Sequence, residues 1–317
     1  MRVIQNLLEL DKPFDATSVT IGNFDGVHLA HQKILRRVVE SARELGAVPT
    51  AVTFDPHPIQ VLAPNRTPSL LTSFDRKARL IEELGIECLV VLNFNQGLAR
   101  LSPAEFVRVI LVERLRAAAV CVGPNFRFGY KQSGDVTLLA ELAHEDGFRL
   151  EVVPILHLRR ERVSSSRIRE LLAEGRVQMA GRLLGRPLSV EGPIVAGLGV
   201  GRAQTVPTLN LAPIAEQLPK RGVYVTRTRL GESLHDSVSN VGTKPTFGEH
   251  RLTVESYLLS FSGEIKETEM EIAFLYRLRD EIKFPESAAL KAQIRKDATR
   301  SLRFFRLLKR FSVADCR

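Results

Sequence analysis

The sequence lacks tryptophan altogether, and it has only three cysteines. Cys88, Cys121 and Cys316 form no CxxC pair, and the first two lie in apolar, strand-like runs where a small buried thiol is expected. This usage excludes a disulfide framework. Because disulfides persist mainly in oxidising compartments, the cysteines favour the reducing cytoplasm as the location of the protein.

Long apolar segments are missing as well. The first residues, MRVIQNLLELDKPFD, lack the apolar core of a secretion signal. No apolar run approaches the roughly 20 residues that a membrane-spanning helix needs. We therefore expect no membrane segment. The hydrophobic fraction of 44% predicts folded domains with real cores rather than disorder.

Negative charge is in the minority. The 45 lysines and arginines outnumber the 36 acidic residues, which gives a formal net charge of +9. Such a charge is compatible with a nucleic-acid partner, whose binding would depend strongly on salt. The arginines are scattered, however, and aromatic side chains, which stack on bases, make up only 6%. We expect small-molecule substrates and no nucleic acid, and the sequence does not indicate an oligomeric state.

The hydrophobic pattern changes near residue 185. Before it, strand-like runs such as residues 87–94 (ECLVVLNF) alternate with amphipathic helical stretches, which predicts an α/β domain with a parallel sheet. After it, short strands between glycine and polar turns predict an antiparallel barrel or sandwich. A helix is expected from about residue 286. Since the length also fits two domains, we expect them at 1–185 and 186–317.

Helix ends are marked by capping residues. A helix over residues 28–46 should end at Gly46, because glycine commonly terminates helices. A second helix should begin after Ser73. A third, over residues 102–115, should begin at Ser102 with Pro103 in its first turn.

Residues 22–33, GNFDGVHLAHQK, form the first candidate site. A strand, a glycine loop and a helix start bring backbone N–H groups together, and with the helix dipole they attract phosphate. His28 and His31 should project from one side of the first helical turn, where they can donate hydrogen bonds to phosphate oxygens. A structural role as helix caps and a zinc site are the alternatives. Zinc needs further ligands, and His57 is the only candidate of the right type.

A second phosphate element is predicted at residues 163–171, VSSSRIREL. Its hydroxyl groups and arginines stand at the start of another helix, and both suit phosphate. The alternative is a serine-capped helix with solvated arginines.

Residues 197–211, GLGVGRAQTVPTLNL, form a third candidate site. They are not a Walker A loop, because no GK[ST] follows, and Gln204 excludes GxGxxG. Thr208 and Asn210 are two apart, so on a strand their side chains would share a face. A hydroxyl and an amide oxygen there can hold Mg²⁺ beside ATP phosphates. A turn with a polar edge is equally compatible with this pattern.

These motifs together resemble a known family. GNFDGVHLAH resembles the HxGH element of nucleotidyltransferases, and SSSRIR resembles their second ATP element, usually SSTxIR. Together with TFDPHP and GPNFRFG they are similar to the N-terminal half of bacterial bifunctional riboflavin kinase/FAD synthetases, and PTLN is similar to the PTxN motif of riboflavin kinases. The resemblance spans nearly the whole chain. It implies a Rossmann-like nucleotidyltransferase domain followed by a riboflavin kinase barrel with a C-terminal helix.

The resemblance also implies chemistry and residue roles. ATP and Mg²⁺ would serve to phosphorylate riboflavin to FMN, and a second ATP would adenylylate FMN to FAD with release of pyrophosphate. In the kinase, Glu255 would be the catalytic base. The ATP-binding residues there would be Gly199, Gly201, Thr208 and Asn210, with Thr208 and Asn210 also holding the metal.

In the adenylyltransferase, His28 and His31 would be catalytic, and Asn125 would bind FMN. The ATP phosphates would meet Gly22, Asn23, Phe24, Asp25, Ser165, Ser166 and Arg169.

Three positions depart from the family pattern. Ala30 replaces the glycine of HxGH, Thr205 stands where glycine commonly precedes PT, and Ser166 replaces the threonine of SSTxIR. Another HxGH enzyme, such as a fragment of a class I aminoacyl-tRNA synthetase, is the rival interpretation. It would leave the PTxN motif and its barrel unexplained.

Overall fold

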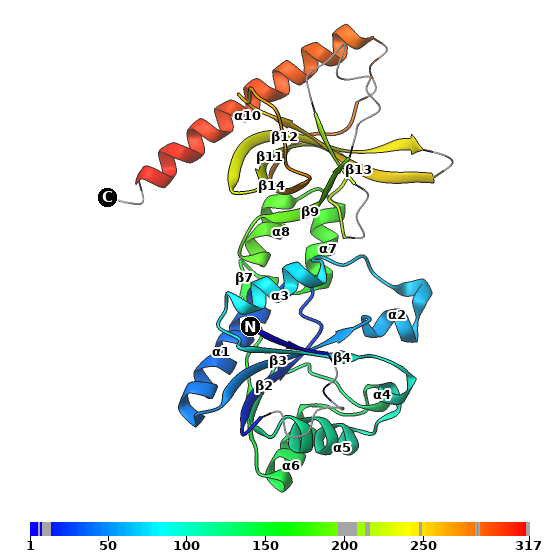
Figure 1. Ribbon diagram of the computed structural model, residues 1–317, viewed down its shortest axis with the longest axis vertical. Helices are drawn as coiled ribbons and strands as arrows, with labels where there is room; N and C mark the ends of the chain where they lie inside the picture. The colour runs from blue at the N-terminus through cyan, green and yellow to red at the C-terminus, as the bar shows by residue number, and fades with distance from the viewer. Residues whose placement is uncertain are drawn as a thin grey trace. The chain divides into compact units, whose positions relative to one another are not determined.

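The computed structural model describes residues 1–5, 7, 14–195, 208–212, 216–246, 249–282, 284 and 286–314. The chain divides into two compact units, Met1–Ser165 and Ser166–Arg317 (Figure 1). The first is an α/β unit and the second contains a closed barrel, as the sequence predicts. The division precedes helices α7 (Ser165–Ala173) and α8 (Val177–Leu184), with only Ser165 on its N-terminal side, whereas the predicted boundary at residue 185 follows them.

The first unit is built on a six-stranded sheet in which every pairing is parallel. In spatial order its strands are β1 (Arg2–Ile4), β4 (Cys88–Asn93), β3 (Val48–Asp55), β2 (Thr17–Ile21), β5 (Ala117–Val122) and β6 (Arg149–Val152). The chain proceeds from β2 to β3 on one side and later to β5 on the other. In open α/β sheets, ligands bind at the carboxyl ends of the strands where the order reverses in this way. That point lies between β2 and β5.

Helices cover both faces of this sheet (Figure 1). α1 (Leu29–Leu45) and α3 (Phe74–Glu82) bury Leu35, Val38 and Ile81 against one face. On the other face lie α5 (Pro103–Phe106), a π-helix (Val107–Arg114) and α6 (Val136–Asp146). Strands covered on both sides are apolar along their length, which is why the β4 sequence shows no polar alternation.

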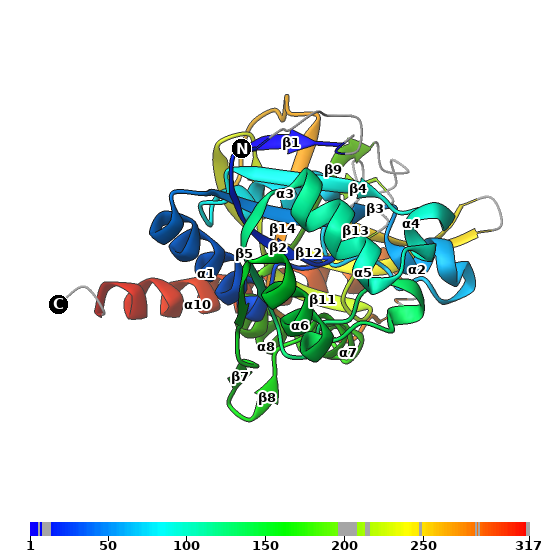
Figure 2. The same ribbon diagram turned by 90° about the horizontal axis from the view of Figure 1, so that it is seen from below.

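Shorter elements complete the first unit. α2 (Pro58–Leu62) and α4 (Gln96–Arg100) follow β3 and β4, and 3₁₀ turns occur at Pro64–Arg66 and Tyr130–Gln132. Strands β7 (His157–Leu158) and β8 (Glu161–Arg162) pair as a small antiparallel hairpin (Figure 2).

Most predicted helix ends are confirmed, and one helix differs. Gly46 terminates α1 in the left-handed conformation, and the Ser73 and Ser102 side chains cap α3 and α5. The helix predicted over residues 102–115 is confirmed, but its second half is a π-helix rather than an α-helix. There, the Leu115 N–H bonds to the Ile110 carbonyl at 3.0 Å, five residues back, so the turn is wider than in an α-helix.

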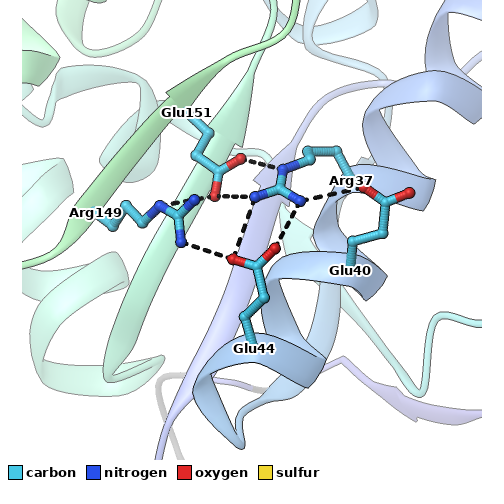
Figure 3. Close-up of polar contacts among 5 residues, drawn as sticks. All are labelled: Arg37, Glu40, Glu44, Arg149 and Glu151. Atoms are coloured by element: carbon cyan, nitrogen blue, oxygen red, sulfur yellow. Dashed lines mark hydrogen bonds and ion pairs between the residues drawn. The ribbon is translucent and has the colours of Figure 1, made fainter.

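An ion-pair network holds α1 against the edge strand β6 (Figure 3). Arg37 of α1 bonds to Glu151 of β6 and to Glu44 of its own helix, and Arg149 bonds to both carboxylates. Hydrogen bonds from Arg37 and Arg149 lower the pKa of Glu44. The network fixes the C-terminal half of the helix whose first turn carries His28 and His31.

The second unit contains a closed six-stranded antiparallel barrel, which decides between the barrel and the sandwich. Around the barrel its strands are β10 (Leu209–Leu211), β13 (Glu249–Leu258), β12 (Ser233–Thr246), β11 (Gly222–Leu230), β14 (Glu269–Arg279) and β9 (Leu188–Val195). β9 pairs with both β14 and β10, and this closes the ring.

Hydroxyl groups form a buried network on one face of the barrel strands. Thr226 lies 2.8 Å from Ser237 and 2.7 Å from Ser239, and Thr228 lies 2.7 Å from Ser256 (oxygen to oxygen). All five side chains are fully buried. Because each hydroxyl both donates and accepts, a closed set of this kind avoids the cost of unpaired buried polar atoms.

The helix α10 (Ser287–Ala314) packs along the opposite face of the barrel strands and confirms the predicted C-terminal helix (Figure 1). Phe305 is buried against Val223, Val225 and Val238, with Ala298, Leu302 and Leu308 beside it. Within the described parts of the chain, no helix combines the length and apolar character needed to cross a membrane.

Candidate functional sites

The loop after β2 lies at the point where the strand order reverses. Three of its residues have positive φ angles: 48° at Phe24, 84° at Gly26 and 39° at Val27. Glycine adopts such angles freely, but for phenylalanine and especially for β-branched valine they are strained. Strain of this kind persists only where surrounding contacts impose it, and it clusters at functional sites.

Side-chain contacts impose this loop shape. The buried Asp25 carboxylate accepts hydrogen bonds from the backbone N–H groups of Leu71 and Thr72, at 2.8 and 3.3 Å. The Gly26 N–H donates to the Thr72 hydroxyl at 3.1 Å, and the Ser165 hydroxyl donates to the Asp25 carbonyl at 2.9 Å. Asp25 and Ser165 therefore have structural roles in the loop, and their contact with ATP stays a prediction.

His28 and His31 lie together at the start of α1. His28 is the N-cap, and its Nδ1 accepts from the His31 N–H at 3.3 Å. The two rings stack with centroids 3.6 Å apart, and the rings of Phe24 and His31 form a T-shaped contact with centroids 5.3 Å apart. Burial, followed by the neighbouring charges of His28 and Lys77, holds the pKa of His31 well below 6.5. A neutral His31 retains one N–H donor for a phosphate oxygen.

Two buried polar atoms around this loop have no hydrogen-bond partner among the described residues: Asn23 Oδ1 and His31 Nδ1. Leaving such atoms unpaired costs free energy, so each calls for a group from outside the described protein. Both lie where the sequence predicts bound ATP.

The sequence does not single out two further residues beside the loop. Lys77 of α3 donates to the Asn23 carbonyl at 3.4 Å and to the Thr53 hydroxyl at 3.1 Å. Thr53, at the end of β3, is fully buried. Thr53 is the first residue of the TFDPHP motif, but the sequence assigned it no role of its own, and Lys77 belongs to no recognisable motif. The amphipathic pattern that predicts α3 gives no indication that Lys77 turns toward the sheet.

The remaining predicted residues of the adenylyltransferase lie as follows. Ser166 is exposed and Arg169 half-exposed on α7, and both belong to the second unit, so their part in ATP binding stays a prediction. Asn125 is exposed in the turn after β5, where the Phe126 N–H bonds to the Gly123 carbonyl at 3.1 Å. It thus follows the strand beside β2, at the same edge of the sheet as the loop.

The zinc alternative gains no support. The Nδ1 atom of His57 accepts from the Ile59 N–H at 3.2 Å, so this side chain caps α2. In the described residues, no group of three or more His, Cys, Asp or Glu side chains is arranged to hold a metal ion.

In the barrel, strand register brings two of the predicted kinase residues, Asn210 and Glu255, together. Asn210 on β10 is directly opposite Glu255 on β13, and Glu255 is also opposite Asn240 on β12. Residues paired in this way point to the same face, with Cβ atoms about 5 Å apart. Asn210 is buried and Glu255 half-buried. The row lies on the face that also carries Tyr257 and Val238, opposite the hydroxyl network.

Glu281 adds a second carboxylate to this row. Its side chain occupies the space that a Cβ at Gly242 would fill, and the Asn240 amide nitrogen is 3.0 Å from the same point. The pairing and this contact reveal Asn240 and Glu281, which the sequence analysis did not assign. Oxygen ligands from carboxylate, amide and hydroxyl groups are those that Mg²⁺ prefers, so the donor set fits this ion.

Thr208 stands immediately before β10 and is exposed, so the strand on which it was expected to share a face with Asn210 begins one residue later. Gly199, Gly201 and Thr205 lie outside the described residues.

Comparisons with known proteins match both units. A FAD synthetase family model matches residues 11–167, and a riboflavin kinase family model matches residues 184–305. The bifunctional riboflavin kinase/FMN adenylyltransferase of Pseudomonas fluorescens is 35% identical, covering 94% of this chain and 96% of its own. The protein of the same name from Escherichia coli strain K12 is 32% identical, covering 98% of this chain and 99% of its own.

A solved structure has the same fold. The crystal structure titled as a macrolide-efflux protein from Streptococcus pneumoniae superposes with a TM-score of 0.84 at 27% identity, covering 94% of this chain and 97% of its own. Both halves thus match in order, and the relatives align along nearly their whole length. The chain belongs to the bifunctional riboflavin kinase/FMN adenylyltransferase family.

Proposed function

We propose that this chain makes FAD from riboflavin in two ATP-dependent steps, each performed by its own unit. The observation that carries the proposal is the presence of two separate sites. One is a strained loop with a buried histidine, His28, stacked on a half-buried one, His31, at the reversal point of a parallel sheet. The other is an amide and carboxylate row on a closed barrel.

The kinase step converts riboflavin to FMN on the barrel. Glu255 accepts the proton of the riboflavin 5′-hydroxyl as its oxygen attacks the γ-phosphorus of ATP, and the bond to ADP breaks. Asn210 lies directly opposite Glu255, so the base and a phosphate-site residue share one face. Thr208 and Asn210 would hold Mg²⁺, which supplies positive charge beside the phosphates when bound.

The adenylyl step converts FMN to FAD in the first unit. An oxygen of the FMN phosphate, already ionised, attacks the α-phosphorus of ATP in line, and the bond to pyrophosphate breaks. No general base is needed, so positioning and charge stabilisation supply the catalysis. Hydrogen-bond donors at the start of α1, with His28 and His31, suit this task, because a helix N-terminus attracts phosphate. Asn125 would contact FMN.

A cytoplasmic location and the lack of a nucleic-acid partner remain part of the proposal. The two described cysteines, which are buried thiols rather than disulfide partners, support the cytoplasmic location. Burial raises the pKa of Cys88 to about 11 and that of Cys121 to about 12, which keeps both protonated and unreactive at neutral pH.

The test is incubation of the purified chain with riboflavin, ATP and Mg²⁺, with FMN and FAD separated by chromatography over time. The proposal expects FMN first and FAD after it. The proposal would be contradicted if the chain formed neither FMN nor FAD, or if it formed FAD only from added FMN.

A further inference from the structure

Lys77 holds the loop after β2 from a different element of the fold. Its Nζ atom, on α3, is 3.4 Å from the Asn23 carbonyl and 3.1 Å from the Thr53 hydroxyl. The Thr53 hydroxyl is itself 3.4 Å from the same carbonyl. Because an ammonium group only donates, Thr53 accepts from Lys77 and donates to Asn23. Two donors from α3 and β3 thus converge on one carbonyl of the loop.

Placing the Lys77 ammonium group beside the loop costs free energy, because the charge is partly removed from water. Burial lowers the pKa of Lys77, and only the nearby carboxylates of Asp25 and Asp55 act against that effect. The Nζ atom of Lys77 lies over the Phe74 ring, 5.5 Å from its centre. A methionine would fill that space without bringing a charge out of water. The ammonium group therefore matters for what it bonds.

Fixing the Asn23 carbonyl also fixes the N–H of Phe24. The two groups belong to one planar trans peptide, so the N–H points away from Lys77 and Thr53. The φ of 48° at Phe24 is unfavourable for a residue with a side chain, and rotation of this peptide is the simplest way to relax it. The bonds from Lys77 and Thr53 oppose that rotation.

We propose that Lys77 is a positioning residue for adenylyl transfer, which holds the Asn23–Phe24 peptide with its N–H directed at the phosphates of ATP. The Nδ1 of His31 has no hydrogen-bond partner among the described residues and its ring lies against that of Phe24, so a phosphate there could accept hydrogen bonds from both His31 and the Phe24 N–H. Asn23 Oδ1 only accepts, so it would need a hydroxyl or amino group of the nucleotide. The inference rests on the proposed function of this loop.

The test compares variants of the full chain in two reactions, FAD formation from FMN and FMN formation from riboflavin. Lys77→Met removes both hydrogen bonds and keeps the length of the side chain. We expect kcat for FAD formation to fall on the order of 10²-fold, since about 1 Å of misplacement can cost that much. The KM for ATP should change little, and FMN formation should be unchanged. Lys77→Arg keeps the donors and should recover most of the loss.

Thr53 provides a matched pair if Lys77→Met fails to fold. Thr53→Val keeps the shape and removes the hydroxyl, whereas Thr53→Ser keeps the hydroxyl. Valine should lower kcat for FAD formation, and serine should stay close to the parent protein. The double variant Lys77→Met/Thr53→Val should be no worse than the poorer single variant, because both act on one peptide. Arg79→Met, an exposed position on the same helix, is the control.

The outcomes separate this inference from the proposed function. If His28→Ala leaves FAD formation intact, the loop is not the adenylyl site and both fail. If His28→Ala abolishes it while Lys77→Met stays within about threefold of the parent, only the role of Lys77 is overturned. Equal losses for methionine and arginine at position 77, with equal falls in melting temperature, would assign Lys77 a structural role and overturn positioning.

Discussion

At the scale of single residues, His31 links the proposed adenylyl site to pH. Burial, then His28 and Lys77, depress its pKa well below 6.5 in the folded protein. Below pH 6.5 the unfolded chain therefore binds a proton that the folded chain does not, and the free energy of unfolding falls as pH decreases. Above pH 6.5 this contribution is fully present.

We expect His31→Gln to flatten the acid side of the stability profile. The measurement is urea unfolding between pH 7.5 and 5.5, followed by circular dichroism. The parent should lose stability over that range more steeply than the variant. His144→Gln, at an exposed position on α6, should keep the parent slope. A parent and a His31 variant with equal slopes would show that His31 is not buried as a neutral group.

Ala30 allows a second test at this scale. It stands in the first turn of α1, between the two histidines, where the family motif has glycine. Its methyl group should favour the helix by about 1 kcal/mol over glycine and tighten the ATP site. We expect Ala30→Gly to raise kcat/KM for ATP in FAD formation by roughly 10–200-fold, since a misfit of one methyl costs about 1–3 kcal/mol. It should lower thermal stability slightly and leave the kinase unchanged. The measurement is the steady-state rate of FAD formation at varied ATP for the parent protein and the variant. An unchanged or lower kcat/KM in the variant would mean that the site accommodates the methyl group of Ala30.

The sequence assigned roles to the residues of the histidine loop, which stay predictions, and gave none to the residues that reach this loop through tertiary contacts. His28 and His31 are visible because a loop and a helix start surround them. Lys77 and Thr53 are 24 residues apart and meet only because α3 packs beside the end of β3. Nothing in either local pattern encodes that contact.

At the scale of elements, one buried ion pair fixes α10 to the barrel. The Asp297 carboxylate accepts from the Arg279 guanidinium of β14 at 2.8 and 3.0 Å, and from Gln293 at 3.0 Å. Asp297 is 2% exposed and the Arg279 side chain 16%. Removing one member of such a pair leaves the other charge buried without its partner.

We expect Asp297→Ala to destabilise the second unit by about 3 kcal/mol. Hydrogen exchange should increase in α10 and in β11 and β14. Asp280→Ala is the matched control, because Asp280 also bonds an arginine of β14, Arg277, but is exposed. That variant should exchange like the parent. Equal protection of α10 in the parent and Asp297→Ala would contradict an anchoring role.

Elements were predictable where local chemistry decides them. Ser73 and Gly46 mark helix ends because caps satisfy backbone groups within a few residues. The π-helix over Val107–Arg114 was not predictable from the sequence, because its apolar pattern suits an α-helix equally well. Asn240 could not be assigned either, since only the register between β12 and β13 places it opposite Glu255.

At the scale of the whole molecule, the alternation of strands and helices predicted the α/β unit, and the short strands between glycine and polar turns predicted a barrel or sandwich. The change of pattern near residue 185 predicted separate domains. Closure of the barrel could not be predicted from the sequence pattern, because it depends on the pairing of β9 with β14, a strand far away along the chain. The place of the boundary is also open to test. The helix α8 packs on the barrel strands β14 and β9. A fragment that begins at residue 186 loses this helix, whereas one that begins at residue 166 keeps it.

We expect a fragment of residues 186–317 to turn riboflavin into FMN and to make no FAD. A fragment of residues 166–317 should do the same and melt at a higher temperature, because it keeps α8. Product chromatography and thermal unfolding check both. A folded fragment 166–317 that makes no FMN would show that the kinase site is not confined to the second unit.

The central claim is that two independent sites act in sequence, and crossed variants test it most directly. Equal amounts of His28→Ala and Glu255→Gln are assayed alone and mixed, with riboflavin, ATP and Mg²⁺, following FMN and FAD by chromatography. Alone, His28→Ala should accumulate FMN without FAD, and Glu255→Gln should convert only added FMN, since losing a base costs about 10²–10⁴-fold. The mixture should make FAD from riboflavin. FAD formation by His28→Ala alone, FMN formation at the parent rate by Glu255→Gln, or loss of both reactions in either variant would contradict the account.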